Sequence, residues 1–176
     1  PFKVPAATAA EWLRAPNVHG RPNSDVLKPI FNGRDVTDRW SGQWVVDFGA
    51  RMSEQDAALY EAPFQYVQQH VLPVRASNKR AARAKYWWRH GEARPGLRDK
   101  WEGLSHYIAT VETAKHRVFV RMPIAFAPEH KLVVIPRSDD MTLGLVSSRM
   151  HVCWATAVGS RIGKGNDPVY ASSTCF

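Results

Sequence analysis

The sequence predicts an α+β fold, in which a helical, basic N-terminal half is followed by a twisted, mostly antiparallel sheet and an amphipathic C-terminal helix. A change of pattern along the chain indicates this fold. Residues 53–88 contain helix-forming residues and capping side chains, whereas short runs rich in Val, Ile and Phe, separated by turn residues, follow residue 105. With 176 residues, 44% of them hydrophobic, the chain can bury a core, and a disordered tail is excluded.

Two regions are expected along the chain. Residues 1–43 are rich in Pro, Gly and Asn, which is typical of an irregular arm or linker that wraps another surface. Residues 44–176 are expected to form the remaining domain, which begins with a short strand at Trp44–Phe48.

Capping and proline signals predict two helices in the first half. One is expected to start at Ser53, where Asp56 three positions later completes a weak capping pattern. Pro63 is expected either to break this helix or to start a second one that ends near Pro73.

The second half is predicted to contain four strands and one helix. The strands are expected at His106–Thr113, Arg117–Met122, Lys131–Ile135 and Thr142–Ser147, with a hairpin turn at Arg137–Asp140 between the last two. Apolar residues at helical spacing then predict an amphipathic helix that ends around Arg161; they are Val146, Met150, Cys153, Trp154, Ala157 and Val158. Residues 163–168 are expected to form an exposed loop.

The positive charge is concentrated in one block. The whole chain carries a formal net charge of +8, and residues 75–100 alone, with nine Lys or Arg and two acidic residues, carry +7. Such a balance favours a polyanionic partner and argues against a calcium buffer or an acidic solvating tail.

Within this block, Ser77–Trp88 is predicted to form a helix with a cationic face beside aromatic residues. Lys79, Arg80 and Arg83 share that face, and a phosphate backbone would fit it because each neutralised phosphate releases counterions. A solvated face with structural tryptophans is the alternative interpretation.

No catalytic or metal-binding pattern stands out. Asp139-Asp140 is better explained by turn chemistry than by a metal, and His151 and Cys153 point in different directions on a helix. Cys153 is expected to be a core thiol, because it lies on the apolar stripe. Asn166-Asp167-Pro168-Val169-Tyr170 departs from the Asn-Pro-Pro-Tyr motif of amino-methylating enzymes at two positions, so no catalytic residue, metal or cofactor is predicted in this chain.

The cysteine content, the length of the apolar runs and the two ends of the sequence limit the class of protein further. Two cysteines cannot form a disulfide scaffold, which indicates a reducing compartment and a cytoplasmic location. No apolar run is long enough to span a membrane, and the start of the chain does not have the form of a signal peptide. Because the sequence starts at Pro1 without a methionine and stops at Phe176 after a Ser/Thr-rich turn, we interpret it as a piece of a larger protein.

A series of sequence strings, in order over nearly the whole chain, carries a specific family resemblance. The strings are PNVHGRPNSDVLKPIFNG (16–33), WVVDFG (44–49), DAALYEAPFQYV (56–67), VLPVR (71–75), WWRHGEARPGLR (87–98), YIATVETAKHRVFV (107–120), LVVIPRSDD (132–140), LVSSRMHVCWA (145–155) and YASSTCF (170–176). With these strings the sequence resembles the target recognition domain of MmeI-like, type IIL (within type IIG) restriction–modification enzymes of bacteria.

The resemblance implies a sequence-specific, double-stranded DNA recognition domain with no chemistry of its own. In such enzymes, which serve phage defence, a nuclease and an S-adenosylmethionine-dependent DNA adenine-N6 methyltransferase precede this region. S-adenosylmethionine and Mg would then be cofactors of the parent chain. Residues 1–43 would contact the upstream methyltransferase domain. The alternatives are a non-catalytic inter-domain or RNA-binding module and, less favoured because no catalytic constellation is present, an autonomous enzyme.

The resemblance also implies roles for individual residues. Base reading is expected in the loop after the amphipathic helix and, as a second candidate, at the predicted hairpin turn: Lys164 to guanine, Asn166 to adenine and Asp167 to cytosine, with Arg161, Arg137 and Asp139 nearby. DNA-backbone contact is expected from Arg75, Lys79, Arg80, Arg83, Arg89 and Lys115. Lys115, His116 and Arg117 lie in a string common to the family, so phosphate contact and structural pairing both remain open for them.

Overall fold

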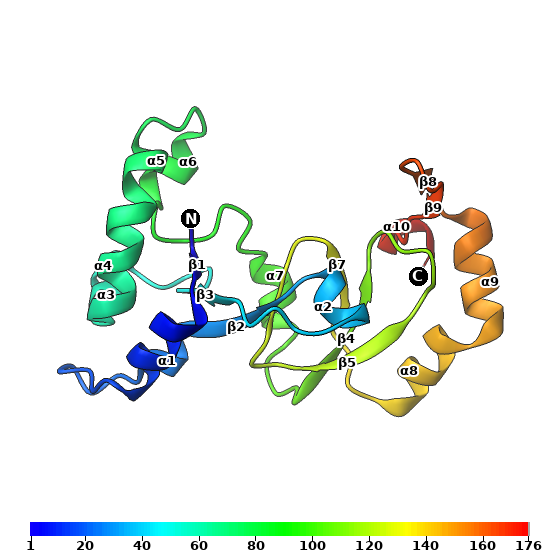
Figure 1. Cartoon of the computed structure of the whole chain (residues 1–176), viewed down its shortest axis with the longest axis horizontal. Coiled ribbons are helices and arrows are strands. Elements are labelled where there is room, and N and C mark those ends of the chain that lie inside the picture. Colours follow the sequence, from blue (N-terminus) through cyan, green and yellow to red (C-terminus); the bar gives the residue numbers. More distant parts are fainter. Residues whose placement is uncertain (176) are drawn as a thin grey trace. The chain divides into compact units, whose positions relative to one another are not determined.

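The computed structural model describes residues 1–175 and divides the chain into two compact units (Figure 1). Unit 1 consists of residues 1–30 and 42–98, and unit 2 consists of residues 31–41 and 99–176. Helices account for 39% of the residues and strands for 19%, with mostly antiparallel sheets, so the predicted α+β class is confirmed. Phe176, the last residue of the resemblance, lies outside the described residues.

Three antiparallel strands form the sheet of unit 1. They are β1 (Lys3–Val4), β3 (Trp44–Val46) and β2 (Leu27–Phe31), in that order. The register pairs Lys3 with Val45 and Leu27 with Val46, and both valines are buried. The predicted strand at Trp44 is therefore present, as the central strand of this sheet.

Residues 1–43 are more regular than we expected. They contain β1, α1 (Ala6–Arg14), the 3-10 turn η1 (Asn23–Asp25), β2 and α2 (Gly33–Thr37). The prediction of irregular backbone was wrong for these segments, because α1 is built from Ala, Glu, Leu and Arg, which favour helix. The helix ends where Ala15, the residue before Pro16, takes an extended conformation. The expected contact of residues 1–43 with a methyltransferase domain stays a prediction.

Short helices complete unit 1. They are α3 (Glu54–Ala58), α4 (Glu61–His70), α5 (Leu72–Ala76), α6 (Ala81–Lys85) and α7 (Pro95–Asp99). The Ser53 hydroxyl caps α3 by accepting the Asp56 N–H at 3.0 Å, as predicted. Pro63 lies in the first turn of α4, where no N–H is needed, so it starts the second helix.

The helix predicted at Ser77–Trp88 is much shorter than expected, since only Ala81–Lys85 is helical. The Asn78 side chain accepts the Arg80 N–H at 3.0 Å and holds the preceding turn outside the helix. At the other end, Trp87 and Trp88 are drawn into the core. Lys79 and Arg80 therefore precede the helix, and the predicted common helical face with Arg83 was wrong.

The sheet of unit 2 has β4 (His106–Val111) between β5 (Phe119–Pro123) and β7 (Leu132–Ile135), all antiparallel. These are three of the four predicted strands. The register aligns Ile108 with Ile135 on one side and with Arg121 on the other. A short strand β6 (Ala127–Pro128) follows β5, and α2 packs against β4.

The fourth predicted strand, Thr142–Ser147, was wrong, as was the hairpin turn before it. This segment is the helix α8 (Asp140–Ser147). The Asp139 carboxylate accepts the Thr142 N–H at 2.7 Å and caps the helix, so the polar residues read as a turn act as a helix start. Ser148 then takes an extended conformation and caps a second helix, α9 (Arg149–Val158), by accepting the His151 N–H at 3.2 Å.

The break at Ser148 changes which side of α9 is buried. The core of unit 2 contains Ile108, Phe119, Ile135, Val146, Ala155, Tyr170 and Cys175. Of the predicted apolar stripe only Val146 belongs to this core, whereas Met150 is 85% and Trp154 60% exposed. Cys153 is exposed as well, so the expectation of a core thiol was wrong; Cys175 is the buried cysteine.

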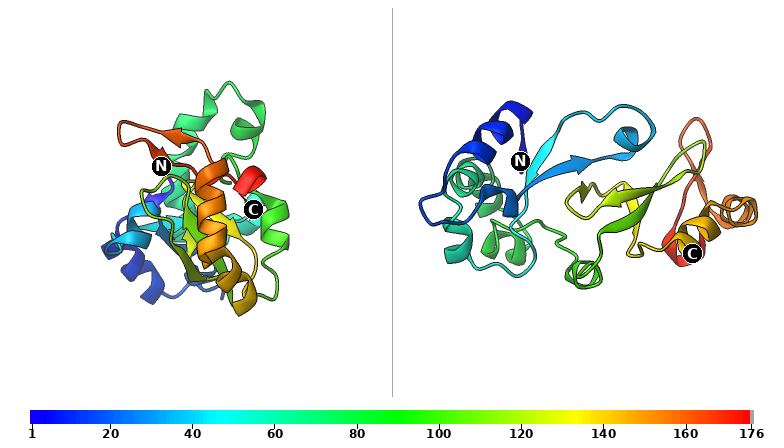
Figure 2. Two further views of the ribbon diagram at one scale, coloured as in Figure 1. Left: turned by 90° about the vertical axis from the view of Figure 1, so that its right-hand side faces the viewer. Right: turned by 90° about the horizontal axis from the view of Figure 1, so that it is seen from below.

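A small hairpin follows α9. Its strands are β8 (Arg161–Ile162) and β9 (Asp167–Pro168), and a last short helix, α10 (Ser172–Cys175), ends the described chain. The hairpin lies beyond the upper end of α9 in Figure 1 and projects to the side of α9 in the left view of Figure 2. The residues expected to form an exposed loop are thus the tip and second strand of this hairpin. Among residues 1–175, no helix is both long and apolar enough to cross a membrane.

Gly159 connects α9 to the hairpin at a point of close approach. A Cβ atom here would lie 2.5 Å from the Val169 carbonyl oxygen and 2.7 Å from that of Ala155. We predict that Gly159→Ala lowers the free energy of unfolding by about 1–3 kcal/mol, measured by urea denaturation, because backbone atoms must move apart.

Gly144→Ala in α8 is the matched control, because a Cβ there meets nothing within 4 Å. It should leave stability unchanged or raise it by about 0.5–1 kcal/mol. Equal effects of the two substitutions would contradict the proposed crowding at Gly159.

Candidate nucleic-acid interface

Two neighbouring tryptophans anchor the basic block of unit 1 to its core. Trp87 and Trp88 are both buried. The Trp87 indole N–H donates to the Glu54 carboxylate at 3.2 Å, and that of Trp88 donates to the Met52 carbonyl at 3.1 Å. The indoles fix the position of the chain between α6 and α7 relative to α3, so the structural role considered for them is the one observed.

Two arginines that we expected at the DNA backbone have their guanidinium groups bound within unit 1. Arg89 donates to the carbonyls of Ala50 at 2.9 Å, Arg51 at 3.2 Å and Met52 at 2.8 Å. Arg75 donates to the Trp87 and Arg89 carbonyls and lies 5.0 Å from the centre of the Phe2 ring. Burial, and then the nearby Arg83, lower the pKa of Arg75.

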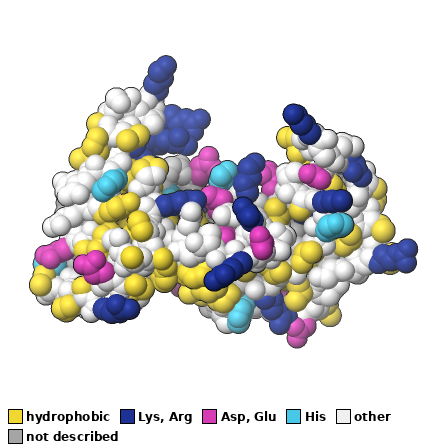
Figure 3. Space-filling view, viewed as in Figure 1, with side chains coloured by type: hydrophobic (Ala, Val, Ile, Leu, Met, Phe, Trp, Pro, Cys, Tyr) yellow, Lys and Arg dark blue, Asp and Glu magenta, His cyan; other side chains and the backbone are white. Residues whose placement is uncertain are grey.

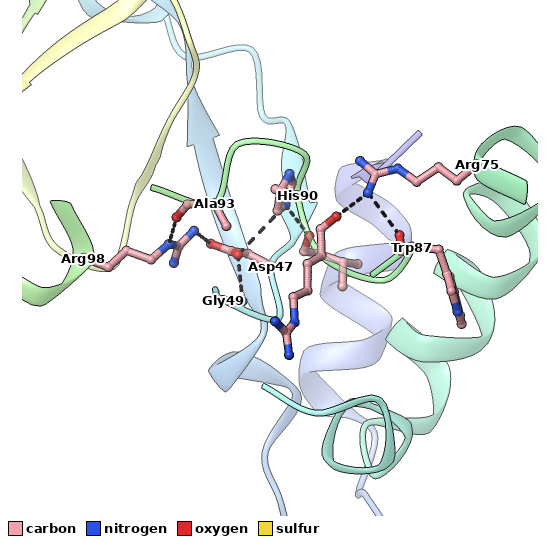
Figure 4. Close-up of polar contacts among 9 residues, drawn as sticks. Asp47, Gly49, Arg75, Trp87, His90, Ala93 and Arg98 are labelled. Atoms are coloured by element: carbon pink, nitrogen blue, oxygen red, sulfur yellow. Dashed lines mark hydrogen bonds and ion pairs between the residues drawn. The ribbon is translucent and has the colours of Figure 1, made fainter. Parts of the chain in front are cut away.

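A partly buried ion pair holds the next part of the block (Figure 4). The Asp47 carboxylate, which directly follows β3, accepts from the Arg98 guanidinium at 2.7 Å and from the Gly49 N–H at 3.0 Å. Arg98 also donates to the Ala93 carbonyl at 2.7 Å. Burial by itself would raise the pKa of Asp47, but the charge of Arg98, together with the hydrogen bonds from Arg98 and the Gly49 N–H, outweighs it and lowers this pKa.

His90 lies beside this pair. Its Nε2 atom is 2.9 Å from the Val46 carbonyl oxygen and 4.0 Å from an Asp47 carboxylate oxygen. Burial lowers the pKa of His90 and outweighs the attraction of Asp47, which favours the neutral ring. The sequence carries no local signal for this cluster, because Asp47 lies 43 positions before His90 and 51 positions before Arg98.

The remaining cations of the block face outward. Lys79, Arg80 and Lys85 are exposed, and the Arg83 guanidinium lies 4.0 Å from the Glu92 carboxylate. Lys and Arg side chains gather over α5 and α6 in Figure 3. Next to them, Tyr86 is 39% exposed, with the Lys85 ammonium 5.4 Å and the Arg89 guanidinium 4.8 Å from its ring centre. We call Lys79, Arg80, Arg83 and Lys85 the α6 basic surface.

The β8–β9 hairpin of unit 2 presents the predicted base-reading residues. Its tip turns through Gly163 and Asn166, whose φ angles of 80° and 50° are left-handed, and the Asn166 N–H donates to the Gly163 carbonyl at 3.1 Å. Lys164 and Asn166 are exposed at the tip, whereas Asp167 is half-buried in β9. Arg161 donates to the Asn166 carbonyl at 3.1 Å and therefore braces the turn.

The base of the hairpin is fixed to β4 by Arg117. Its guanidinium donates to Thr110 Oγ1 at 3.1 Å, to the Val111 carbonyl and to the Pro168 carbonyl at 3.1 Å. Burial lowers the pKa of Arg117. Phosphate contact and structural pairing were both open for Arg117, and structural pairing is the role observed. Lys115 and His116, in contrast, are exposed.

Tyr170 anchors the chain just after the hairpin. Its N–H donates to the Glu112 carbonyl at 2.7 Å, and its hydroxyl lies 2.9 Å from His151 Nε2 on α9. Burial raises the pKa of Tyr170 to about 12, so the hydroxyl keeps its proton and can donate to the ring. Arg117 and Tyr170 together join the hairpin, β4 and α9 into one rigid base.

Arg137 and Asp139, the second candidate readers, bind each other. The Arg137 Nε atom donates to the Asp139 carboxylate at 2.9 Å, and the same carboxylate caps α8. The hydrogen bonds from the Thr142 N–H and hydroxyl, followed by Arg137, lower the pKa of Asp139 to about 2. Within residues 1–175, no group of three His, Cys, Asp or Glu side chains is placed to hold a metal ion.

No protein-family model and no curated protein sequence matches the chain. Among solved structures, it resembles the type IIL restriction–modification enzyme MmeI in complex with DNA, with a TM-score of 0.66 and 15% sequence identity.

The similarity to MmeI extends over 99% of this chain but only 22% of the MmeI chain. The whole of the present fold therefore corresponds to one part of that enzyme. At this level of identity the similarity is one of fold.

We predict that the neutral state of His90 makes stability dependent on pH. In the unfolded chain His90 takes up a proton as the pH falls through about 6.5, whereas the folded chain resists it, so stability is greatest well above this value and declines as the pH falls from about 7 toward 5. Denaturation by urea across this range measures the decline.

His90→Gln keeps an N–H for the Val46 carbonyl and should give a shallower decline over the same range. The Asp47 carboxylate does not confuse the result, since its lowered pKa affects stability only at pH values approaching its ordinary 3.8 and below. If wild type and His90→Gln lost stability in parallel, His90 would not be the group responsible.

Proposed function

We propose that this chain is the sequence-specific, double-stranded DNA recognition domain of a bacterial restriction–modification enzyme. The observation that carries the proposal is the similarity of its complete fold to one part of MmeI, an enzyme whose structure was solved with DNA. The adenine-N6 methyltransferase, its S-adenosylmethionine, and any nuclease would reside in other parts of the same polypeptide, and the domain would act in the bacterial cytoplasm.

The α6 basic surface would bind the phosphate backbone. Lys79 and Arg80 project from a turn that precedes α6, and their side chains have no hydrogen bond or ion pair with the described part of the chain. Cations in this state can replace the counterions of DNA without first losing an internal partner. In this proposal Arg75 and Arg89 support the surface from behind, and Lys115 of unit 2 contributes a further phosphate contact.

The β8–β9 hairpin would read bases. The major groove of B-DNA is about 12 Å wide and admits a two-stranded β-ribbon. Lys164 and Asn166 at the exposed tip carry the groups that recognise guanine and adenine, and Asp167 can accept from cytosine N4. Arg161 would position the turn. Because Arg137 and Asp139 bind each other and cap α8, the proposal assigns base reading to the hairpin.

The proposed phosphate contacts can be tested by substitution. Lys79→Ala and Arg80→Ala should each weaken duplex binding to a similar extent on all sequences, and each should reduce the slope of log K against log salt concentration by about one. Titrations of labelled duplexes at several salt concentrations measure both quantities.

Arg34→Ala is the matched control, since Arg34 is an exposed arginine of α2 paired with Asp38 and lies outside both candidate surfaces. It should keep the wild-type salt slope. An unchanged slope in Lys79→Ala and Arg80→Ala, or a preference for RNA over duplex DNA in the wild type, would contradict the proposal and favour the RNA-binding alternative.

The proposed base contacts of the hairpin can be tested in the same way. Lys164→Ala and Asn166→Gly should each relax the selected sequence at one position, because a good bidentate contact contributes about 1–3 kcal/mol of discrimination. Glycine is chosen at 166 since it accepts the left-handed φ while removing the amide. Selection from a randomised duplex library gives the preferred sequences.

Lys79→Ala serves as the control in this selection and should enrich the wild-type sequence at lower affinity. If the two hairpin variants also enriched the wild-type sequence without change, the hairpin would not be the base-reading element.

A further inference from the structure

One residue of the hairpin does not fit a polar loop. Ile162 in β8 is 59% exposed, although its neighbours at the hairpin tip are Gly163, Lys164, Gly165 and Asn166. The buried cluster of unit 2 does not include it. The apolar side chain therefore lies in solvent next to a hairpin tip that is made of glycine, lysine and asparagine.

The fixed base of the hairpin prevents Ile162 from turning into the core. The Val169 N–H donates to the Ser160 carbonyl at 2.8 Å, and Arg117 holds the Pro168 carbonyl. A change of register by one residue would bring Ile162 to the opposite face, but these bonds and the buried Tyr170 fix the register. Its exposure is thus built into the fold.

The register pairs Ile162 with Asp167. Side chains of directly opposed residues in an antiparallel pair lie on the same face, with Cβ atoms about 4.5–5.5 Å apart. One face of the hairpin therefore presents a branched apolar side chain next to a carboxylate. In the major groove, these two chemistries complement the thymine methyl group and the exocyclic amino group of adenine or cytosine, respectively.

We propose that Ile162 is a specificity-determining residue that contacts the 5-methyl group of a thymine. The inference rests on the proposed DNA-recognition function and adds a residue and a base to it. Successive base pairs are about 3.4 Å apart, so the spacing of the Ile162–Asp167 pair places this thymine in the same base pair as the amino group read by Asp167, or in an adjacent one.

The test removes the methyl group from the DNA instead of from the protein. Starting from the duplex selected by the wild-type chain, each thymine is replaced singly by deoxyuridine, which lacks only the 5-methyl group. Affinities are measured by fluorescence anisotropy. We expect one position at which uracil weakens binding by about three- to fivefold, the effect of burying a single methyl group.

Ile162→Ala identifies the protein side of the contact. This variant should bind the thymine and uracil duplexes equally at that position, while keeping the wild-type preference at the others. Val158→Ala is the control, because Val158 is a partly exposed apolar residue at the end of α9 and outside the hairpin. It should keep the discrimination between thymine and uracil.

The outcomes separate this inference from the proposed function. A selected sequence with no uracil-sensitive position, or discrimination that survives in Ile162→Ala, overturns the role of Ile162 and leaves DNA recognition standing. If the wild-type chain selects no duplex sequence, the proposed function fails, and the inference fails with it. The uracil series on wild-type protein decides the matter even if Ile162→Ala does not fold.

Discussion

Carbonyl groups of irregular backbone need hydrogen-bond donors when they are removed from water, and three arginines meet this requirement in the present fold. Arg75 and Arg89 each donate to two or more backbone carbonyls of irregular segments, and Arg117 donates to carbonyls at the ends of β4 and β9. The guanidinium group suits this role because it carries five donors and remains charged when partly buried. The turn before α3, the chain after α6 and the base of the hairpin all depend on these contacts.

This constraint changes the meaning of the positive charge. The block at residues 75–100 has a net charge of +7, but the guanidiniums of Arg75, Arg89 and Arg98 are bound to carbonyls or to Asp47. The cations of this block that face solvent are mainly those of the α6 basic surface, and one of them, Lys85, lies 5.4 Å from the ring centre of the exposed Tyr86. Within about 25 positions, basic side chains thus have two separate roles: some bind groups inside unit 1, and others face solvent. Only the burial of each side chain distinguishes the two.

Unit 2 shows how a rigid support and an exposed tip are combined. Tyr170 and Arg117 fix the base of the hairpin to β4 and α9, while the tip itself consists of glycine and polar residues with few contacts. Such an arrangement keeps the backbone of the hairpin in place. Side chains at the tip can therefore be substituted without loss of the fold. The break at Ser148 separates α9 from α8, and the outer side of α9 exposes Met150 and Trp154.

The sequence by itself determined the α+β class, the strands β3, β4, β5 and β7, the helix start at Ser53 and the concentration of charge in one block. These features depend on local propensity, on caps and on the spacing of apolar residues, which are encoded within a few neighbouring positions. The same local logic failed at Thr142–Ser147, where Asp139 caps a helix, and at Ser77–Trp88, where burial of two tryptophans outweighs helix propensity.

Only the tertiary structure decided which arginines are bound internally, where Asp47 and Arg98 meet, and that Ile162 stands beside Asp167 on an exposed hairpin. Each of these facts depends on contacts between residues that are distant in the chain or on the register of a strand pair. Long-range packing sets them, and composition and periodicity carry no information about it.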